Sequence, residues 1–324
     1  MTHMRIGRVT GIEIGANWSW LLVVALVVWT LADEVFPSTN PDLSGGTYVA
    51  MAIAAALLFS ASIVLHELGH ARQARREGME VGGITLWALG GIARFTGMFP
   101  SPAAELRVAI AGPAVSLLLG AVFVALAAIF QPGSAADGVV AWLGYINLLL
   151  FAFNLIPALP MDGGRVLRSA LWRLRGDLVA ATRIAAGVGF ALGAVMVAAG
   201  LLSGLAGAEA SGLWIAIIGA FVMMAGRAEA DAVAIRAVLG GHRVHEAMSP
   251  MSIAGPPPAG LPRVDADADL ATSVAAVLQA GATVAAVVER GEVVGRLDVN
   301  GVMRRVRERR PRGLTPSRGL PAGR

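Results

Sequence analysis

The chain contains no cysteine among its 324 residues. This absence excludes disulfide bonds, thiolate metal sites and a cysteine nucleophile, so any bound metal must be held by histidine, aspartate or glutamate. Lysine is also absent, and all 26 basic residues are arginine. Charged residues make up only 15% of the sequence, whereas hydrophobic residues make up 56%. This balance excludes an ordinary soluble domain and predicts a protein that crosses a membrane several times.

Long apolar stretches predict six transmembrane helices. They lie at residues 17–33, 48–70, 104–130, 138–157, 179–203 and 212–226. The first stretch lacks a convincing cleavage site for a signal peptide, so we expect it to be retained as a span. The expected fold class is a polytopic α-helical membrane protein.

Arginine placement predicts how these spans are oriented. Six spans leave both ends of the chain on one side of the membrane. The loops on that side carry arginines, and the loops on the other side carry acids and no arginine. The positive-inside rule therefore predicts that both termini and the His70 end of the second span face the cytoplasm of a bacterial cell.

The second apolar stretch ends in His66-Glu67-Leu68-Gly69-His70. Histidines four residues apart share one face of a helix and can bind one Zn²⁺, while the glutamate between them can act as a base. Residues 51–59, which precede this motif, are all apolar. We therefore expect hydrolytic metal chemistry at membrane depth.

A catalytic zinc site needs a third protein ligand, and Asp162 is the best candidate. It follows the fourth apolar stretch at the membrane face that also holds His70. Nearby prolines break the helix, and Gly163 and Gly164 allow close backbone approach. The alternative is that Asp162 caps a helix in a cytoplasmic turn, since Asp-Gly pairs are common in turns.

Residues 79–99 are rich in glycine but largely apolar, which predicts short membrane-associated strands. Irregular backbone near membrane depth must be buried in protein or line a watery cavity, so we expect this segment to fold beside the metal site. An exposed strand edge there could pair with an unwound substrate.

The His66 to His70 motif, followed by Asn154…Pro157…Asp162-Gly163, resembles the site-2 protease family of intramembrane zinc metalloproteases. Gly90-Gly91 and Ala111-Gly112-Pro113 agree with the same pattern. The resemblance covers residues 5–230. It implies a zinc endopeptidase that cleaves single-span membrane proteins, which in bacteria commonly include anti-sigma factors.

The resemblance also implies a role for each matching residue. His66, His70 and Asp162 would bind one Zn²⁺, and Glu67 would be the catalytic base. Asn154 would help to hold the substrate or the oxyanion.

The C-terminal part predicts a small cytoplasmic α/β domain, with a helix at 271–280 and strands at 283–289 and 292–298. Residues 245–248 and 293–297 resemble one CBS motif, a module that occurs in some site-2 proteases. CBS motifs normally work in pairs, so one copy makes a homodimer conceivable. Asp298 and Gly301 depart from the residues that bind nucleotides in that family, which argues against an adenosine nucleotide here.

The expected organisation is a metalloprotease domain at 1–230, a CBS-like domain at 231–310 and a disordered, arginine-rich tail at 311–324. Eight arginines fall in residues 304–324 against one acid, Glu308. Beside a membrane protein, we expect this end to contact lipid headgroups and no specific nucleic acid.

Two other classes of function stay open. One is a zinc-binding membrane scaffold or sensor without turnover, although a purely structural site has no use for the base Glu67. The other is a metal transporter, which needs polar residues along a path through several spans. Here the acids cluster at one end, near His70 and Asp162.

Overall fold

The computed structural model describes residues 3–88, 90–95, 97–207, 209–250 and 260–308. The chain divides into two compact units, Met1–Glu229 and Ala230–Arg324, and each is described by itself. The expected tail at 311–324 lies outside the described residues.

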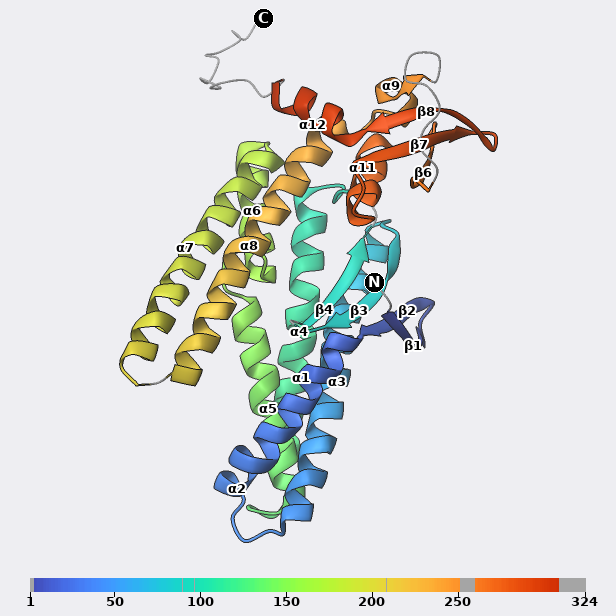
Figure 1. The fold of residues 1–324 in the computed structure, drawn as a ribbon. Coiled ribbons are helices and arrows are strands. Elements are labelled where there is room, and N and C mark those ends of the chain that lie inside the picture. The colour runs from blue at the N-terminus through green and yellow to red at the C-terminus, as the bar shows by residue number, and fades with distance from the viewer. Residues whose placement is uncertain (1–2, 89, 96, 208, 251–259, 309–324) are drawn as a thin grey trace, which may run out of the picture. The chain divides into compact units, whose positions relative to one another are not determined.

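Within the described ranges, six helical segments of the chain are long and apolar enough to cross a membrane. This finding confirms the prediction of a polytopic helical membrane protein. The first segment joins α1 (Trp18–Thr30), a π-helical stretch (Leu31–Val35) and α2 (Phe36–Thr39). The others are α3 (Gly45–Arg76), α4 (Pro102–Ala127), α5 (Ala135–Asn154), α7 (Leu178–Leu205) and α8 (Glu209–Leu239), shown in Figure 1.

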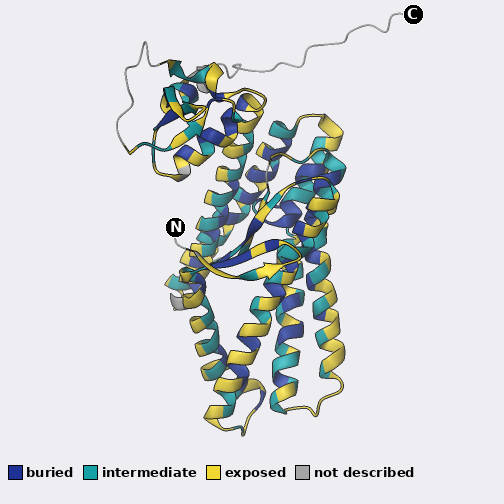
Figure 2. Ribbon diagram, turned by 90° about the vertical axis from the view of Figure 1, so that its right-hand side faces the viewer, coloured by how far each residue is buried: buried dark blue, intermediate teal, exposed yellow. Residues whose placement is uncertain are grey.

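Many apolar residues on these helices are exposed, and Figure 2 shows exposed residues in yellow along the helices. Leu22, Trp29, Leu118 and Leu201 are each 60–64% exposed. A continuous surface of this kind would be costly in water, and helices that contact lipid are expected to have it.

A four-stranded sheet belongs to the first unit and has the order β1-β2-β3-β4. Its strands are β1 (His3–Val9), β2 (Ile12–Asn17), β3 (Val81–Trp87) and β4 (Gly90–Phe95). The strands predicted at 79–99 are confirmed as β3 and β4. The hairpin β1-β2 is an addition, although Ile12 and Ile14, buried at alternating positions, carry the period-2 pattern of β2.

The sheet packs against the half of α3 that carries the two histidines. Ile12 of β2 and Ile84 of β3 form an apolar cluster with Ala71 of α3, one residue after His70. Strand β2 lies parallel to β3, with Ile14 opposite Ile84, and β3 is antiparallel to β4. Strand β4 therefore forms one edge of the sheet, next to α3.

Between α5 and α7 lies α6 (Asp162–Arg175), a short amphipathic helix that packs on α4 and α7. It begins after a compact turn at 155–161. Leu159 N–H in that turn donates to the carbonyl of Ala185 in α7 at 3.3 Å. The turn therefore fixes where α6, and with it Asp162, begins.

The second unit is a small α/β fold. It contains α9 (Val244–Ala247), β5 (Ser249–Pro250), β6 (Arg263–Asp265), α11 (Leu270–Gln279), β7 (Val284–Glu289), β8 (Glu292–Asp298) and α12 (Val299–Glu308). The sheet order is β5-β8-β7-β6, with β6 and β7 parallel and joined through α11. The predicted helix and both predicted strands are confirmed, whereas the shorter elements carry too few residues for a periodic signal.

Candidate metal centre

His66, His70 and Asp162 come together in the first unit, although they lie on two helices. The two histidines are on α3, and Asp162 is the first residue of α6. His70 Nε2 lies 3.2 Å from His66 Nε2 and 3.1 Å from Asp162 Oδ2, and His66 Nε2 lies 3.3 Å from the same oxygen. All three side chains are buried. Among the described residues, no other group of three His, Asp or Glu ligands converges in this way.

Helix α4 orients both imidazole rings from behind. His70 Nδ1 lies 2.7 Å from the carbonyl oxygen of Val108, and His66 Nδ1 lies 2.8 Å from Ser116 Oγ. A carbonyl can only accept, so His70 carries its proton on Nδ1 and leaves the lone pair of Nε2 facing the other ligands. A serine hydroxyl can accept as well as donate, so the Ser116 contact is compatible with the same tautomer for His66.

The three ligand atoms fit a tetrahedral metal ion. Two imidazole lone pairs and a carboxylate at 3.1–3.3 Å from one another would repel without a cation between them. Bonds of about 2.0–2.1 Å to a tetrahedral Zn²⁺ place ligand atoms roughly 3.3 Å apart, which agrees with this spacing. Zinc sites of three protein ligands keep the fourth position for water or substrate.

Gly112 of α4 forms the floor of this site. A Cβ atom at that position would lie 2.2 Å from His70 Nε2 and 2.7 Å from His66 Nε2. Any side chain at residue 112 would therefore collide with both rings.

Asp162 reaches the histidines because the turn before it is tightly folded. Cβ atoms at Gly163 and Gly164 would lie 2.3 Å from the Leu155 carbonyl oxygen and 2.3 Å from the Leu159 nitrogen, so only glycine fits. Met161, not Asp162, occupies the N-cap of α6, and no side chain caps that helix. The alternative of a capping aspartate is therefore wrong.

Asp162 is held in its charged form by the histidines. Burial disfavours a carboxylate, but without a metal the positive charge of a protonated His70 and hydrogen bonds from His66 and His70 outweigh that effect, and they hold the pKa of Asp162 below its ordinary value. A carboxylate must be deprotonated to bind a metal, and the geometry meets that requirement.

Glu67 and Asn154 line the same cavity as the three ligands, which has a volume of about 590 Å³. Strand β4 closes on Glu67, because a Cβ atom at Gly91 would lie 2.4 Å from Glu67 Cγ. Asn154 ends α5 and donates from Nδ2 to the Leu150 carbonyl at 2.9 Å. The structure thus brings all five predicted site residues to one cavity.

A buried ion network beside the cavity is absent from the sequence-based predictions. Arg168 of α6 donates from Nε to Glu105 of α4 at 2.6 Å and from Nη1 to Glu229 of α8 at 2.8 Å. The positive-inside pattern counts the arginines after the fourth apolar stretch, Arg168 among them, as residues of a cytoplasmic loop. Glu105 inside an apolar stretch is the signal that could have identified the network, because such a charge needs a partner.

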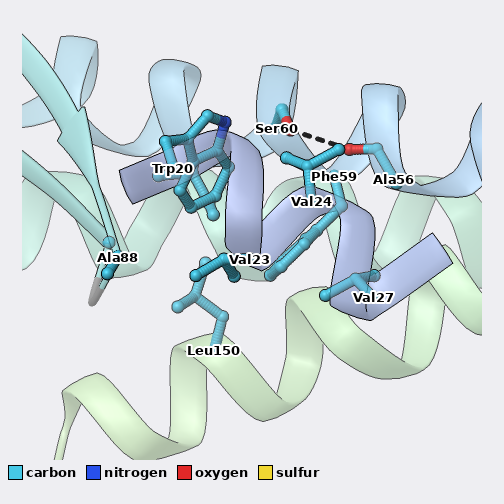
Figure 3. A pocket seen from close by; sticks show the side chains of 11 residues that line it. Trp20, Val23, Val24, Val27, Ala56, Phe59, Ser60, Ala88 and Leu150 are labelled. Atoms are coloured by element: carbon cyan, nitrogen blue, oxygen red, sulfur yellow. Dashed lines mark hydrogen bonds between the residues drawn. The ribbon is translucent and has the colours of Figure 1, made fainter. Parts of the chain in front are cut away.

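A second pocket, of about 220 Å³, lies between α1, α3 and α5 (Figure 3). Trp20, Phe59 and Leu150 line it together with valines of α1, and its hydroxyl group, Ser60 Oγ, donates to Ala56 of its own helix. Its lining holds no titratable side chain. The larger cavity is therefore the candidate for chemistry.

The profile of peptidase family M50 matches residues 54–137 and 131–199. Rip3 of Mycobacterium tuberculosis, provisionally named a zinc metalloprotease, is 39% identical over 248 residues, which are 75% of this chain and 63% of Rip3. The Synechocystis protein sll0528, with the same kind of provisional name, is 36% identical over 256 residues, 77% of this chain and 65% of that protein.

The chain thus spans less than two-thirds of the length of these curated relatives. A solved structure with a similar sequence is the site-2 protease from Methanocaldococcus jannaschii. It is 30% identical, the match covers 71% of this chain and 95% of that chain, and the TM-score is 0.49.

Proposed function

Because the chain belongs to peptidase family M50, we propose that it is a zinc-dependent endopeptidase of the site-2 protease type, which cleaves single-span membrane proteins within the membrane. The observation that carries this proposal is the convergence of His66, His70 and Asp162 beside Glu67 in one cavity between apolar helices. The zinc metalloprotease names of the relatives support the same metal and reaction.

Each side chain has a role that follows from its place. His66, His70 and Asp162 would hold Zn²⁺, which when bound supplies a Lewis acid that activates water and polarises a peptide carbonyl. Glu67, between the two histidines and facing the cavity, accepts a proton from the attacking water and returns it to the leaving amine. Asn154, which lines the same cavity, would help to hold the substrate or the oxyanion.

A substrate helix must unwind before it can be cleaved, because its peptide bonds are shielded by helical hydrogen bonds. Unpaired backbone groups in hydrocarbon cost several kcal/mol each, so the opened strand needs protein partners. Strand β4 supports this step, since it forms an edge of its sheet and Gly91 lies so near Glu67 that a Cβ atom there would overlap it. Helix-weakening residues near the cleavage point are expected, and anti-sigma factors are the bacterial substrates that we propose.

We propose that both termini and the active-site end face the cytoplasm. Arg75 and Arg76 end α3, and Arg173 and Arg175 end α6. The loop between α4 and α5 carries no arginine.

We further propose that the second unit is a CBS-like module that can pair two copies of the chain. The sequence resemblance and the α/β arrangement support the module. Asp298 Oδ1 accepts from Gly301 N–H at 3.1 Å at the start of α12. Because Asp298 and Gly301 depart from the nucleotide-binding residues of CBS motifs, we do not propose an adenosine nucleotide as its ligand.

The proposal is tested by quantitative membrane proteomics on cells that express the wild-type chain or Glu67→Gln. This change removes the base and leaves the three metal ligands in place. We expect single-span proteins, or stubs trimmed outside the membrane, to accumulate only with Glu67→Gln.

Glu80→Gln is the matched control, because Glu80 is exposed and lies outside the cavity. Identical profiles for wild type and Glu67→Gln under several stress conditions would contradict proteolysis. They would favour a zinc-binding scaffold or sensor, and zinc uptake that depends on the chain would favour a transporter.

A further inference from the structure

Arg165 stands in the wall of the catalytic cavity, beside the residues already described. It follows Asp162 by three residues on α6, so the two side chains share one face of that helix. Glu67, Asp162 and Arg165 all line the cavity, and the mechanism above makes no use of the arginine.

Arg165 has a buried donor group that the described part of the protein leaves without an acceptor. Its Nε–H is buried and has no hydrogen-bond acceptor among the described residues. The carboxylate oxygen paired with it, Glu229 Oε1, lies 3.8 Å from Nε, beyond hydrogen-bond range. That same oxygen already accepts from Arg168 Nη1 at 2.8 Å.

Helix packing does not explain Arg165, because Arg168 fills that role. The Arg168 side chain is 4% exposed and bonds to Glu105 and Glu229 on two other helices. The Arg165 side chain is 26% exposed and lines the cavity. One arginine thus joins three helices, while the other presents its guanidinium to whatever enters the cavity.

Arg165 stays protonated and positively charged. Burial disfavours the guanidinium, but the carboxylates of Glu229, Asp162, Glu105 and Glu67 outweigh it and raise the pKa of Arg165. A permanently charged group with unused donors at a cavity wall requires an acceptor that arrives with the ligand.

We propose that Arg165 is a substrate-binding residue that donates hydrogen bonds to a backbone carbonyl oxygen of the unwound substrate strand, beside the scissile bond. An unwound strand presents carbonyl oxygens that have lost their helical partners, and in an apolar setting each needs a donor. A carbonyl fits better than a substrate carboxylate, since acidic side chains are rare within membrane spans. This inference rests on the proposed function.

The first test measures binding rather than turnover. The probe is a fluorescent, synthetic single-span peptide with a central Gly-Pro pair, and the receptor is the full chain, loaded with zinc in nanodiscs, in a Glu67→Gln background. Adding Arg165→Met should raise the peptide Kd on the order of 10- to 100-fold, as loss of a charge-assisted hydrogen bond does. Arg165→Lys should recover part of the affinity, since it keeps the charge and loses the planar fork.

Arg173→Met is the matched control, because Arg173 is exposed on the same helix and lies outside the cavity lining. It should leave the Kd unchanged. Zinc content and thermal stability should be the same in Arg165→Met and Arg173→Met, because Glu229 keeps its bond to Arg168 in both.

A second test replaces single carbonyl oxygens of the peptide by sulfur, a weaker acceptor, at positions flanking the Gly-Pro pair. With Arg165 present, one of these thioamides should weaken binding. With Arg165→Met, the same thioamide should cost nothing further, because both changes remove one interaction.

The inference is overturned if Arg165→Met binds the peptide with the same Kd as Arg173→Met. It is also overturned if the losses of affinity caused by the thioamide and by Arg165→Met are additive. If Arg165→Met loses zinc or stability, the thioamide series on the chain that retains Arg165 is the deciding test. Equal binding of all the thioamide peptides and the unmodified peptide would then overturn the inference. A wild-type chain that binds the peptide, shows the thioamide effect and never cleaves it would refute the proposed function while the Arg165 assignment stands.

Discussion

Single atoms decide whether three ligands can share one ion at this site. Gly112 leaves the space that the two Nε2 atoms occupy, and Val108 and Ser116 fix the rings from the other side. Site geometry at this scale is set as much by the missing Cβ atom as by the ligands themselves.

Gly112→Ala is therefore expected to abolish tight zinc binding. Its Cβ would lie 2.2 Å from His70 Nε2, so the ring must turn away and at least one ligand is lost. Zinc content of the purified chain, measured by mass spectrometry after a chelator wash, should fall well below one ion per chain. Gly187→Ala is the control, since a Cβ there meets nothing within 4 Å, and equal zinc content in the two variants would contradict the account.

Pairs of elements are joined near the site by charged contacts at their ends. Glu77 at the C-terminal end of α3 accepts two hydrogen bonds from Arg107 of α4, each 2.7 Å long. The bond from Arg107 holds the pKa of Glu77 at about 2, against an ordinary value of 4.5.

This contact predicts a loss of stability in acid. Because the folded state lowers the pKa of Glu77, its contribution is complete above pH 4.5 and is lost as the pH falls towards about 2. The unfolding midpoint of the wild-type chain in detergent should therefore fall more steeply between these values than that of Glu77→Gln. Parallel pH profiles for the two proteins would show that the bond contributes nothing.

Three helices of the membrane unit are joined by Arg168, which links α6 to the first turn of α4 and to α8. Arg168→Met would leave Glu105 buried and uncompensated, at a cost of about 3–5 kcal/mol. We expect a clearly lower unfolding midpoint, and partial recovery when Glu105→Gln is added. If Arg168→Met alone were as stable as the wild type, water would have to reach Glu105.

Orientation in the membrane is also a property of the whole molecule, and the absence of cysteine makes it easy to measure. Gln131→Cys lies in the loop between α4 and α5, and Arg175→Cys lies at the end of α6; both residues are exposed. In intact cells, a membrane-impermeant maleimide should label Gln131→Cys and should reach Arg175→Cys only after permeabilisation. The reverse pattern would overturn the proposed topology.

Elements whose signal is local could be predicted from the amino-acid sequence alone. Six apolar runs specified the spans, and the spacing of His66, Glu67 and His70 placed them on one turn of helix, because both patterns need only neighbours along the chain. Glycine-rich strands at 79–99 and the C-terminal helix and strands followed from the same kind of signal.

Which distant residues meet depends on how the helices pack. His70 and Asp162 are 92 residues apart and come within 3.1 Å. The partners of the histidines on α4, the link from Arg168 to Glu105 and Glu229, and the open donors of Arg165 depend likewise on how helices cross. How two helices cross depends on close packing at glycines. The sequence shows a glycine only as a small residue and does not show which helix packs against it. A residue's chemistry can be read along the sequence, but its partner is fixed by packing.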